Sequence, residues 1–376
     1  MTASSPSATR SGTDPIAHRL HSLDALRGFD MFWIMGGDNL ASVLLDRVQS
    51  PTATTLREQL EHVEWEGFRF YDLIFPLFLF LVGCVIPFSL HRYSGQPVAA
   101  TGRILRRTTL LILLGLVCNG LLNFNFAQFR WCGVLQRIGI CYGCAALLCL
   151  TLTPRKLVAT VIAILLGYWA LLALVPVPGG TAGDYSKAGN LAGWVDRTLL
   201  PGVILKPWYG DGDNEGLLST LPAIATPLIG CLAGIWLRSH RTGFSKTCGL
   251  FAAGLALLAV GTAWGDVFPI IKNLWTSSFV LVAAGWSLLL IAVFHLVIDV
   301  LGFRRWAFPF TVIGVNAITI YVAPRFMDFD HLTAFFLSGT ARLSGSWNQT
   351  VMAAGVLAAE WLFLLWLYRS RTFLRL

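Results

Sequence analysis

Long apolar stretches alternate with short polar connections along almost the whole chain. A helix needs about 20 mostly apolar residues to cross the ~30 Å hydrocarbon core of a bilayer. The stretches of that length cover residues 25–45, 71–90, 104–123, 132–152, 156–175, 218–237, 247–264, 277–299, 306–324 and 348–368. The pattern predicts an all-α polytopic membrane protein with about ten transmembrane helices.

Composition strengthens this prediction. Hydrophobic residues make up 55% of the 376 residues and charged residues only 13%, whereas soluble domains carry about 25% charged residues. The net charge of +8 would suggest a nucleic-acid partner for a soluble protein. Because the basic residues here flank apolar stretches, we read them as topology signals and expect no nucleic acid. Cys141 and Cys144 have helical spacing inside an apolar stretch, which favours packing over a metal or redox site.

The distribution of charge predicts the orientation. Most of the 28 lysines and arginines fall on one side of the membrane if both termini are cytoplasmic, as the positive-inside rule requires. Residues 1–22 are expected to be a disordered cytoplasmic tail, and residues 23–376 a single transmembrane domain. Two long outer loops remain, residues 46–70 and 176–217. The second contains Trp208 and Tyr209 among other aromatic residues, which favours a packed cap.

Ionisable residues near apolar stretches need a partner or a role. Asp72 opens the second predicted span, so it either caps that helix or combines capping with a function. Arg137 either extends to the membrane surface or pairs with an outer carboxylate. His62 lies among carboxylates just before the second span, and a histidine exchanges protons near neutral pH. A nearby carboxylate could orient its imidazole for catalysis. The alternative is an ordinary solvated histidine.

Six motifs in order resemble the heparan-α-glucosaminide N-acetyltransferase family of transmembrane acyltransferases, particularly its bacterial members. They are RLHSLDALRGFDMFWIM (19–35), HVEWEGFRFYDLIFPLFLFLVG (62–83), GVLQRIGICY (133–142), DNEGLLSTLPAI (213–224), KNLWTSSFVL (272–281) and GVNAITIYV (314–322). The resemblance implies transfer of an acetyl group from cytoplasmic acetyl-CoA to an amino sugar or glycan on the outer side. It also implies a bacterial inner-membrane location and a homodimer.

The resemblance assigns roles to single residues. The family's catalytic histidine falls on His62, followed by Asp72 at the start of the second span. Asp38 stands where the family usually has asparagine, and we include it with His62 and Asp72 as catalytic. The predicted substrate-binding residues are Asn39, Gln136, Arg137, Asp213, Asn214, Glu215, Lys272, Asn273, Trp275 and Asn316. Trp208 and Tyr209 are further candidate sugar contacts.

Two parts of the co-substrate acetyl-CoA are expected to contact the protein: its anionic nucleotide end and the arm that carries the acetyl group. Polyanionic CoA would bind basic side chains at the inner surface, while its slender arm passes between helices. The predicted CoA-binding residues are Arg27, Arg103, Arg106 and Arg107. Asn39 and Asn316 are candidate oxyanion donors. Membrane lipid is a further expected partner, and no metal is expected.

A small-molecule transporter without acyl transfer is the alternative. Many spans and the membrane-embedded Asp38, Asp72 and Glu360 would suit it. Transporters are expected to have broken or symmetric helices, which the hydropathy pattern does not indicate. Stabilisation by CoA would distinguish the enzyme from the transporter.

Overall fold

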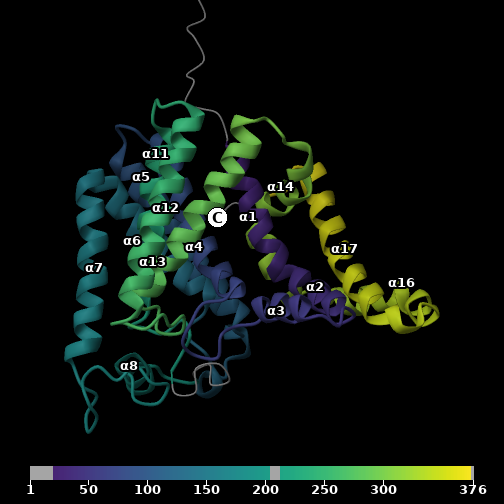
Figure 1. The fold of residues 1–376 in the computed structure, drawn as a ribbon, viewed down its shortest axis with the longest axis horizontal. Coiled ribbons are helices and arrows are strands. Elements are labelled where there is room, and N and C mark those ends of the chain that lie inside the picture. Colours follow the sequence, from purple (N-terminus) through teal and green to yellow (C-terminus); the bar gives the residue numbers. More distant parts are fainter. Residues whose placement is uncertain (1–19, 204–211, 374–376) are drawn as a thin grey trace, which may run out of the picture.

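A computed structural model describes residues 20–203 and 212–373 of the chain (Figure 1). The predicted sugar contacts Trp208 and Tyr209 lie outside these residues, as does the predicted tail except for its last three residues. His21 already belongs to the first helix. Within the described ranges the secondary structure is helical, and the one β-type contact is an isolated bridge between Arg130 and Gly202.

Seven helices in the described ranges are long and apolar enough to cross a membrane, and a bent pair makes an eighth. This confirms the predicted all-α polytopic membrane fold. The seven are α4 (Phe70–His91), α6 (Val134–Thr151), α7 (Pro154–Leu174), α10 with α11 (Thr220–Ala223, Ala225–Arg238), α12 (Gly243–Gly265), α13 with η5 (Ser277–Phe294, His295–Val300), and α17 (Asn348–Arg369) with the preceding turn.

The other three predicted spans are helical but interrupted or charged. The first divides into α1 (His21–Phe32), a π-helical turn η2 (Trp33–Gly37) and α2 (Asp38–Leu45), because Gly36 has a φ of 106°. The third is α5 (Pro97–Cys118), which carries three arginines. The ninth is the bent pair α14 (Phe308–Val315) and α15 (Ala317–Val322), which turns by 60° at Asn316. Hydropathy averages over such breaks and does not reveal them.

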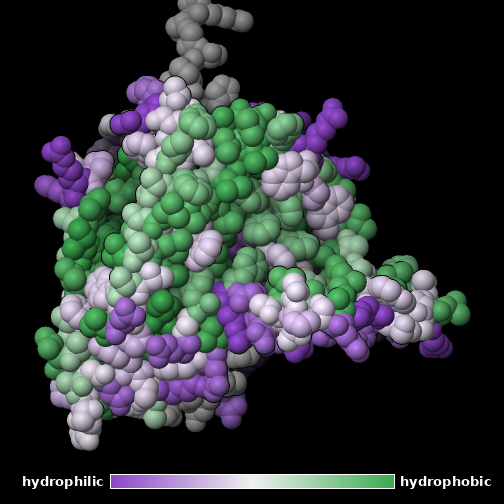
Figure 2. Space-filling view, viewed as in Figure 1, coloured by the Kyte–Doolittle hydropathy of each residue, from purple (hydrophilic) through white to green (hydrophobic). Residues whose placement is uncertain are grey.

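The helices run between two ends of the bundle (Figure 1). The connections α4–α5, α6–α7 and α11–α12 lie at one end, which we call the basic end because it holds Arg92, Arg155 and Arg238. The segments 46–69, 176–203, 212–219 and 266–276 lie at the opposite end, the loop end. Figure 2 shows an apolar band across the bundle and a polar layer over the loop end.

The loop end is built from short helices and turns rather than open loops. Tyr185 and Trp194 pack with the buried Tyr168 and Phe268, so the described part of the second long loop is a packed cap, as predicted. The shorter elements are α3 (Pro51–Gln59), η3 (Leu121–Asn123), η4 (Phe126–Gln128), α8 (Leu191–Leu199), η6 (Arg305–Ala307), η7 (Ala323–Arg325), α16 (Phe329–Leu343) and η8 (Gly345–Trp347).

Close backbone approach fixes α4, the helix that carries much of the site. A Cβ at Gly230 of α11 would lie 2.1 Å from the carbonyl oxygen of Phe80 in α4. A Cβ at Gly83 would lie 2.1 Å from the carbonyl oxygen of Pro227 in α11, and one at Gly234 would lie 2.3 Å from that of Cys84 in α4. Small residues at such crossings let membrane helices pack backbone against backbone. The position of α4 is therefore set by its contact with α11.

Candidate functional site

Three side chains from distant parts of the chain meet at the loop end of α4. Nδ1 of His62 lies 2.8 Å from Oδ1 of Asp72. Nζ of Lys272 lies 3.3 Å from the same oxygen, 3.0 Å from Nδ1 and 3.4 Å from Nε2 of His62. The side chain of Asp72 is 2% exposed, that of Lys272 21% and that of His62 32%. The imidazole is thus half-buried in a polar cluster and not in open solvent.

The geometry selects one tautomer of His62. An ionised Asp72 only accepts hydrogen bonds, so Nδ1 carries the proton and donates it to Oδ1. Lys272 then donates to Asp72, and its Nζ lies beside the ring edge of His62, 3.0 Å from Nδ1 and 3.4 Å from the unprotonated Nε2. A carboxylate that fixes Nδ1–H and leaves Nε2 with a lone pair is the arrangement that prepares a histidine for proton transfer.

Asp72 also caps its helix. Its Oδ2 accepts hydrogen bonds from the backbone N–H of Arg69 (3.2 Å) and Val63 (3.3 Å). Asp72 is the third residue of α4, where a carboxylate satisfies free N–H groups and suits the helix dipole. The two oxygens therefore have separate tasks, one toward the helix end and one toward His62. Of the two alternatives for Asp72, the structure favours capping combined with a contact to the histidine.

The segment that carries His62 is tied to the other loop-end segments. The N–H of Gly67 donates to the carbonyl of Ile270 at 2.8 Å, two residues before Lys272. Gly67 has a φ of 122°, which a residue with a Cβ rarely adopts. The indole N–H of Trp65 donates to the carbonyl of Tyr185 at 2.9 Å. These bonds hold His62 at a fixed distance from the segment that bears Lys272.

Lys272 sits in a tight turn before α13. The N–H of Trp275 donates to the carbonyl of Lys272 (2.9 Å), and Trp275 has a φ of 52° in the left-handed region. Thr276 caps α13 and also accepts from the N–H of Ile271. Burial lowers the pKa of Lys272, and the neighbouring Asp72 opposes this shift. The turn therefore presents a partly desolvated amine to His62.

Two cavities meet at His62. The first, of about 240 Å³, is mostly apolar and extends between the helices from His62 past Phe75 to Phe78 and Ile138; we call it the bundle cavity. The second, of about 480 Å³, is polar and lies among the loop-end segments; we call it the loop cavity. The residues that line both are His62, Asn214, Lys272 and Asn273.

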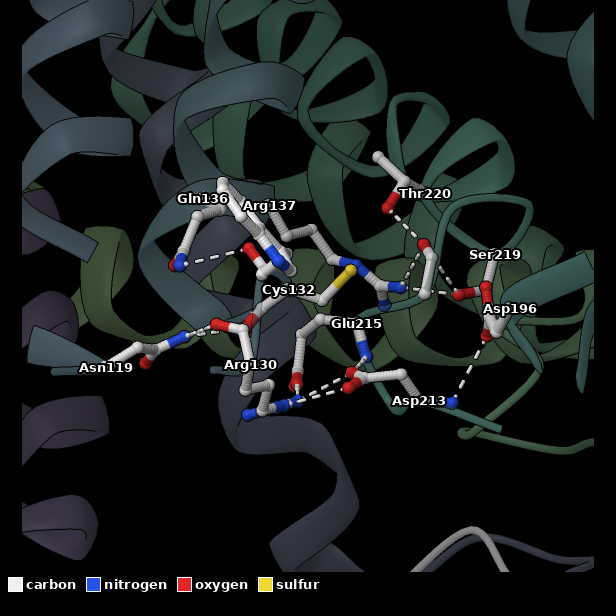
Figure 3. A network of polar contacts seen from close by, with 12 residues as sticks. Asn119, Arg130, Cys132, Gln136, Arg137, Asp196, Asp213, Glu215, Ser219 and Thr220 are labelled. Carbon is white, nitrogen blue, oxygen red and sulfur yellow. Dashed lines mark hydrogen bonds and ion pairs between the residues drawn. The ribbon is translucent and has the colours of Figure 1, made fainter. Parts of the chain in front are cut away.

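The segment 213–216, which supplies Asn214 and Glu215, is held by a network of ions and backbone bonds (Figure 3). Arg130 donates to both oxygens of Asp213, at 2.6 and 2.8 Å, and also to Glu215. Burial opposes the charge of Arg130, but the two carboxylates raise its pKa above the usual range. Since Asp213 is 1% exposed and fully engaged, its contacts fix the segment instead of reaching a cavity.

Asp196 of α8 anchors the same segment from the other side (Figure 3). Its oxygens accept from the N–H of Asp213 (3.1 Å) and of Leu217 (2.9 Å). Burial raises the pKa of Asp196 to about 6, even though the two N–H donors act in the opposite direction. A Cβ at Gly216 would lie 2.0 Å from Oδ2 of Asp196, so the close approach requires glycine.

Arg137 does not reach the surface, and within the described ranges it forms no ion pair with a carboxylate. It is 1% exposed, donates to Ser219 and to the carbonyl of Gly216 (3.3 Å), and lies 5.0 Å from the Trp275 ring. The idea that Arg137 extends to the membrane surface is therefore wrong, and the described residues provide no carboxylate partner for it. The segment 213–219 covers it, and its contacts brace the back of the site. Gln136 is also buried, with its amide facing the carbonyl of Trp131 (3.4 Å).

Several predicted residues do not reach the two cavities. Asn39 is exposed and Asn316 is 2% exposed at the bend between α14 and α15, and neither lines the bundle or loop cavity. Asp38 is one step removed: the hydroxyl of Tyr71 hydrogen-bonds to it, and the Tyr71 ring lies 4.9 Å from the His62 ring. Trp275 does line the bundle cavity.

The predicted CoA-binding arginines lie toward the basic end. Arg103 and Arg106 are exposed, while Arg107 stacks on Tyr142 at 4.4 Å. Arg27 pairs with Asp24 at 3.8 Å. None of the four lines the bundle cavity, whose residues nearest to that end include Met31 and Phe78. They share an end of the bundle but no contact with His62.

Tyr71, Arg130 and Asp196 contribute to the site although the sequence did not single them out. Tyr71 is next to Asp72, and its position in the first turn of α4 was the available signal. Arg130 and Asp196 pair with residues 83 and 17 positions away, and no local pattern indicates such partners. In the described ranges no group of three or more His, Cys, Asp or Glu residues could hold a metal ion.

Comparison with known proteins gives two relatives. The human heparan-alpha-glucosaminide N-acetyltransferase is 29% identical over 324 residues, which cover 70% of this chain and 48% of the relative. The mouse protein of the same name is 27% identical over 328 residues, 71% of this chain and 49% of the relative. The resemblance to the heparan-alpha-glucosaminide N-acetyltransferase family is therefore confirmed. The chain spans about half the length of these relatives, and no family model matches it.

Proposed function

We propose that the protein is a transmembrane acyltransferase that moves an acetyl group from acetyl-CoA to an amino sugar or glycan. The observation that carries the proposal is the position of His62 between an apolar cavity inside the bundle and a polar cavity at the loop end. An acyl donor and an acceptor in these two cavities would meet at one imidazole. The names of the two relatives support the reaction class.

The bundle cavity suits the donor. Its lining by Ile74, Phe75, Phe78 and Ile138 matches a thioester and the thin, weakly polar arm that carries it. The anionic nucleotide end of CoA would bind Arg103, Arg106 and neighbouring basic residues at the opposite end, which we assign to the cytoplasm. His62 and the loop cavity would then face the outer side of a bacterial inner membrane.

The loop cavity suits the acceptor. It is lined by Glu61, Glu64 and Trp65 in addition to His62. Carboxylates attract an ammonium group and accept hydrogen bonds from hydroxyls, and an indole ring offers an apolar face for a sugar. Asn214 and Asn273 line both cavities, which places them beside the position proposed for the reacting carbonyl oxygen. We assign the oxyanion role to these two residues rather than to Asn39 and Asn316, which line neither cavity.

The chemistry uses Nε2 of His62. The acceptor nitrogen attacks the thioester carbonyl, the new C–N bond forms, and the C–S bond breaks with its electron pair on sulfur. Nε2 takes the proton from the nitrogen and passes it to the departing thiolate, while Asp72 stabilises the imidazolium. If Nε2 itself attacks the thioester first, acetyl-His62 forms and the acceptor then displaces the imidazole. Both routes require the same tautomer.

The test compares His62→Ala with His331→Ala, an exposed histidine of α16 that lines neither cavity. Membranes containing the His62 variant should lose transfer from labelled acetyl-CoA to glucosamine, and the His331 variant should keep it. Thermal stabilisation by CoA should persist in both variants, since the imidazole is remote from the arginines. Full transfer by the His62 variant would end the proposal.

One observation favours the transporter alternative. The 60° bend at Asn316 breaks a span, and such breaks are common where transporters bind ions or substrates. A transporter should move substrate in proteoliposomes without an acyl donor. It should not be stabilised by CoA, whereas the acyltransferase should be.

A further inference from the structure

Lys272 places a primary amine at the junction of the two cavities. Its Nζ is 3.4 Å from Nε2 of His62, the atom assigned to proton transfer, and the residue lines both cavities. In the proposed function an acceptor amine must approach the same Nε2 from the loop cavity. The chain therefore already holds an amine in the place where the acceptor amine is expected.

We propose that Lys272 is a self-acylation site, which takes the acyl group when no acceptor occupies the loop cavity. This inference rests on the proposed function, because the acyl donor is the thioester in the bundle cavity. The turn formed by Lys272 and Trp275 holds the amine against His62, so the reaction is intramolecular once the donor is bound. A fixed geometry of this kind greatly raises the local concentration of a nucleophile.

The step is balanced without any further reactant. The lone pair of Nζ attacks the carbonyl carbon, a C–N bond forms, and the C–S bond breaks with its electrons on sulfur. His62 takes a proton from Nζ and returns it to the thiolate, so the products are Nε-acetyl-Lys272 and CoA thiol. From acetyl-His62 the same attack breaks the bond to Nε2 and restores the imidazole.

The surroundings of Lys272 determine the fraction of its amine that is neutral and therefore nucleophilic. Burial favours its neutral form, and the ion pair with Asp72 at 3.3 Å favours the charged form. The ion pair therefore protects Lys272 while acceptor turns over, and labelling should rise with pH. Once acetylated, the side chain is neutral, leaves Asp72 without its cation and occupies the acceptor position. Modified protein should consequently be slow in transfer.

Lys187 offers a matched control in the same cavity. It lines the loop cavity but not the bundle cavity, pairs with Glu64 at 3.2 Å and is 40% exposed. Nonspecific acetylation in solution should modify the exposed Lys187 at least as fast as Lys272. Transfer guided by the site should favour Lys272, since Nζ of Lys272 lies 3.4 Å from Nε2 of His62, whereas Lys187 pairs with Glu64 and does not line the bundle cavity.

The experiment incubates the purified full chain in detergent with isotopically heavy acetyl-CoA, with and without glucosamine. Peptide mass spectrometry then locates the heavy acetyl group in the wild type, in His62→Ala and in Lys272→Arg. We expect Lys272 to carry at least about a hundred-fold more label than Lys187, given typical effective molarities. Label at Lys272 should fall in His62→Ala and when glucosamine is present.

Each outcome decides the inference. Equal labelling of Lys187 and Lys272, or undiminished labelling in His62→Ala, overturns it. A wild type that is stabilised by CoA and leaves Lys272 unlabelled overturns the inference but not the proposed function. A wild type that is neither stabilised by CoA nor labelled overturns both.

Discussion

Arg130 holds Asp213 with two hydrogen bonds, at 2.6 and 2.8 Å, and so joins the start of α6 to the segment that carries Asn214. The side chain of Asp213 is fully buried in this pair. The two residues thereby link a turn near the membrane surface to the edge of both cavities.

Arg130→Met should destabilise the protein strongly. Removing one partner of a buried ion pair typically costs about 3–5 kcal/mol because the other charge stays buried. Thermal unfolding in detergent measures the loss. The control is Arg57→Met, which breaks the exposed pair with Asp46 at 3.4 Å and should cost at most about 1 kcal/mol. Equal effects of the two variants would show that the Arg130 pair does not hold the segment.

Asp72→Asn should reduce acetyl transfer by about 10²–10⁴-fold, the usual range for a contribution to acid–base catalysis. The remaining carbonyl oxygen can still cap α4, so folding should change little, but the amide cannot stabilise an imidazolium as a carboxylate does. Initial rates with labelled acetyl-CoA, alongside thermal unfolding, check this expectation. Wild-type rates in this variant would remove Asp72 from the mechanism.

Variants of Asp38 test whether this residue influences His62 through Tyr71. Asp38→Asn should keep most of the activity, because the amide oxygen can still accept from the Tyr71 hydroxyl. Asp38→Leu cannot accept, so Tyr71 should shift against the His62 ring and transfer should fall about 10- to 100-fold. Measuring kcat and KM for both variants separates positioning from binding. Equal rates for the two variants would contradict the proposed contact.

Asp196 makes the stability of the protein depend on pH. Its pKa is about 6 in the folded protein against an ordinary value of 3.8, so between these pH values the folded state binds more protons than the unfolded state. Stability from this group is therefore complete below pH ~4 and is lost as the pH rises to ~6. Asp196→Asn should flatten this slope in thermal unfolding, whereas the exposed Asp266→Asn should retain it.

The sequence was sufficient to predict those parts of the site whose residues are close together along the chain. His62 and Asp72 lie ten residues apart around the start of one helix, and the boundary between polar and apolar residues predicts where that helix begins. Lys272 is 210 residues from His62. Its place beside His62 depends on the packing of α13 against α4, and only the resemblance to a family indicated it.

Other features could not be predicted because they depend on single backbone angles or on burial by remote segments. Gly36 breaks the first span through its φ of 106°, and Asn316 marks the bend of the ninth, yet both lie in apolar stretches. Arg137 looked able to reach water at the end of its helix. The segment 213–219 covers it, and a hydropathy profile does not indicate burial by a segment so far away in the sequence.

Because the two cavities share part of their lining, a substitution that enlarges one of them also affects the other. The apolar bundle cavity and the polar loop cavity share a wall, which consists of His62, Asn214, Lys272 and Asn273. Opening that wall to admit a bulkier acceptor would also admit water, which would hydrolyse the thioester without useful product. If the protein is the proposed acyltransferase, variants that accept larger acceptors should therefore also lose more acetyl-CoA to hydrolysis.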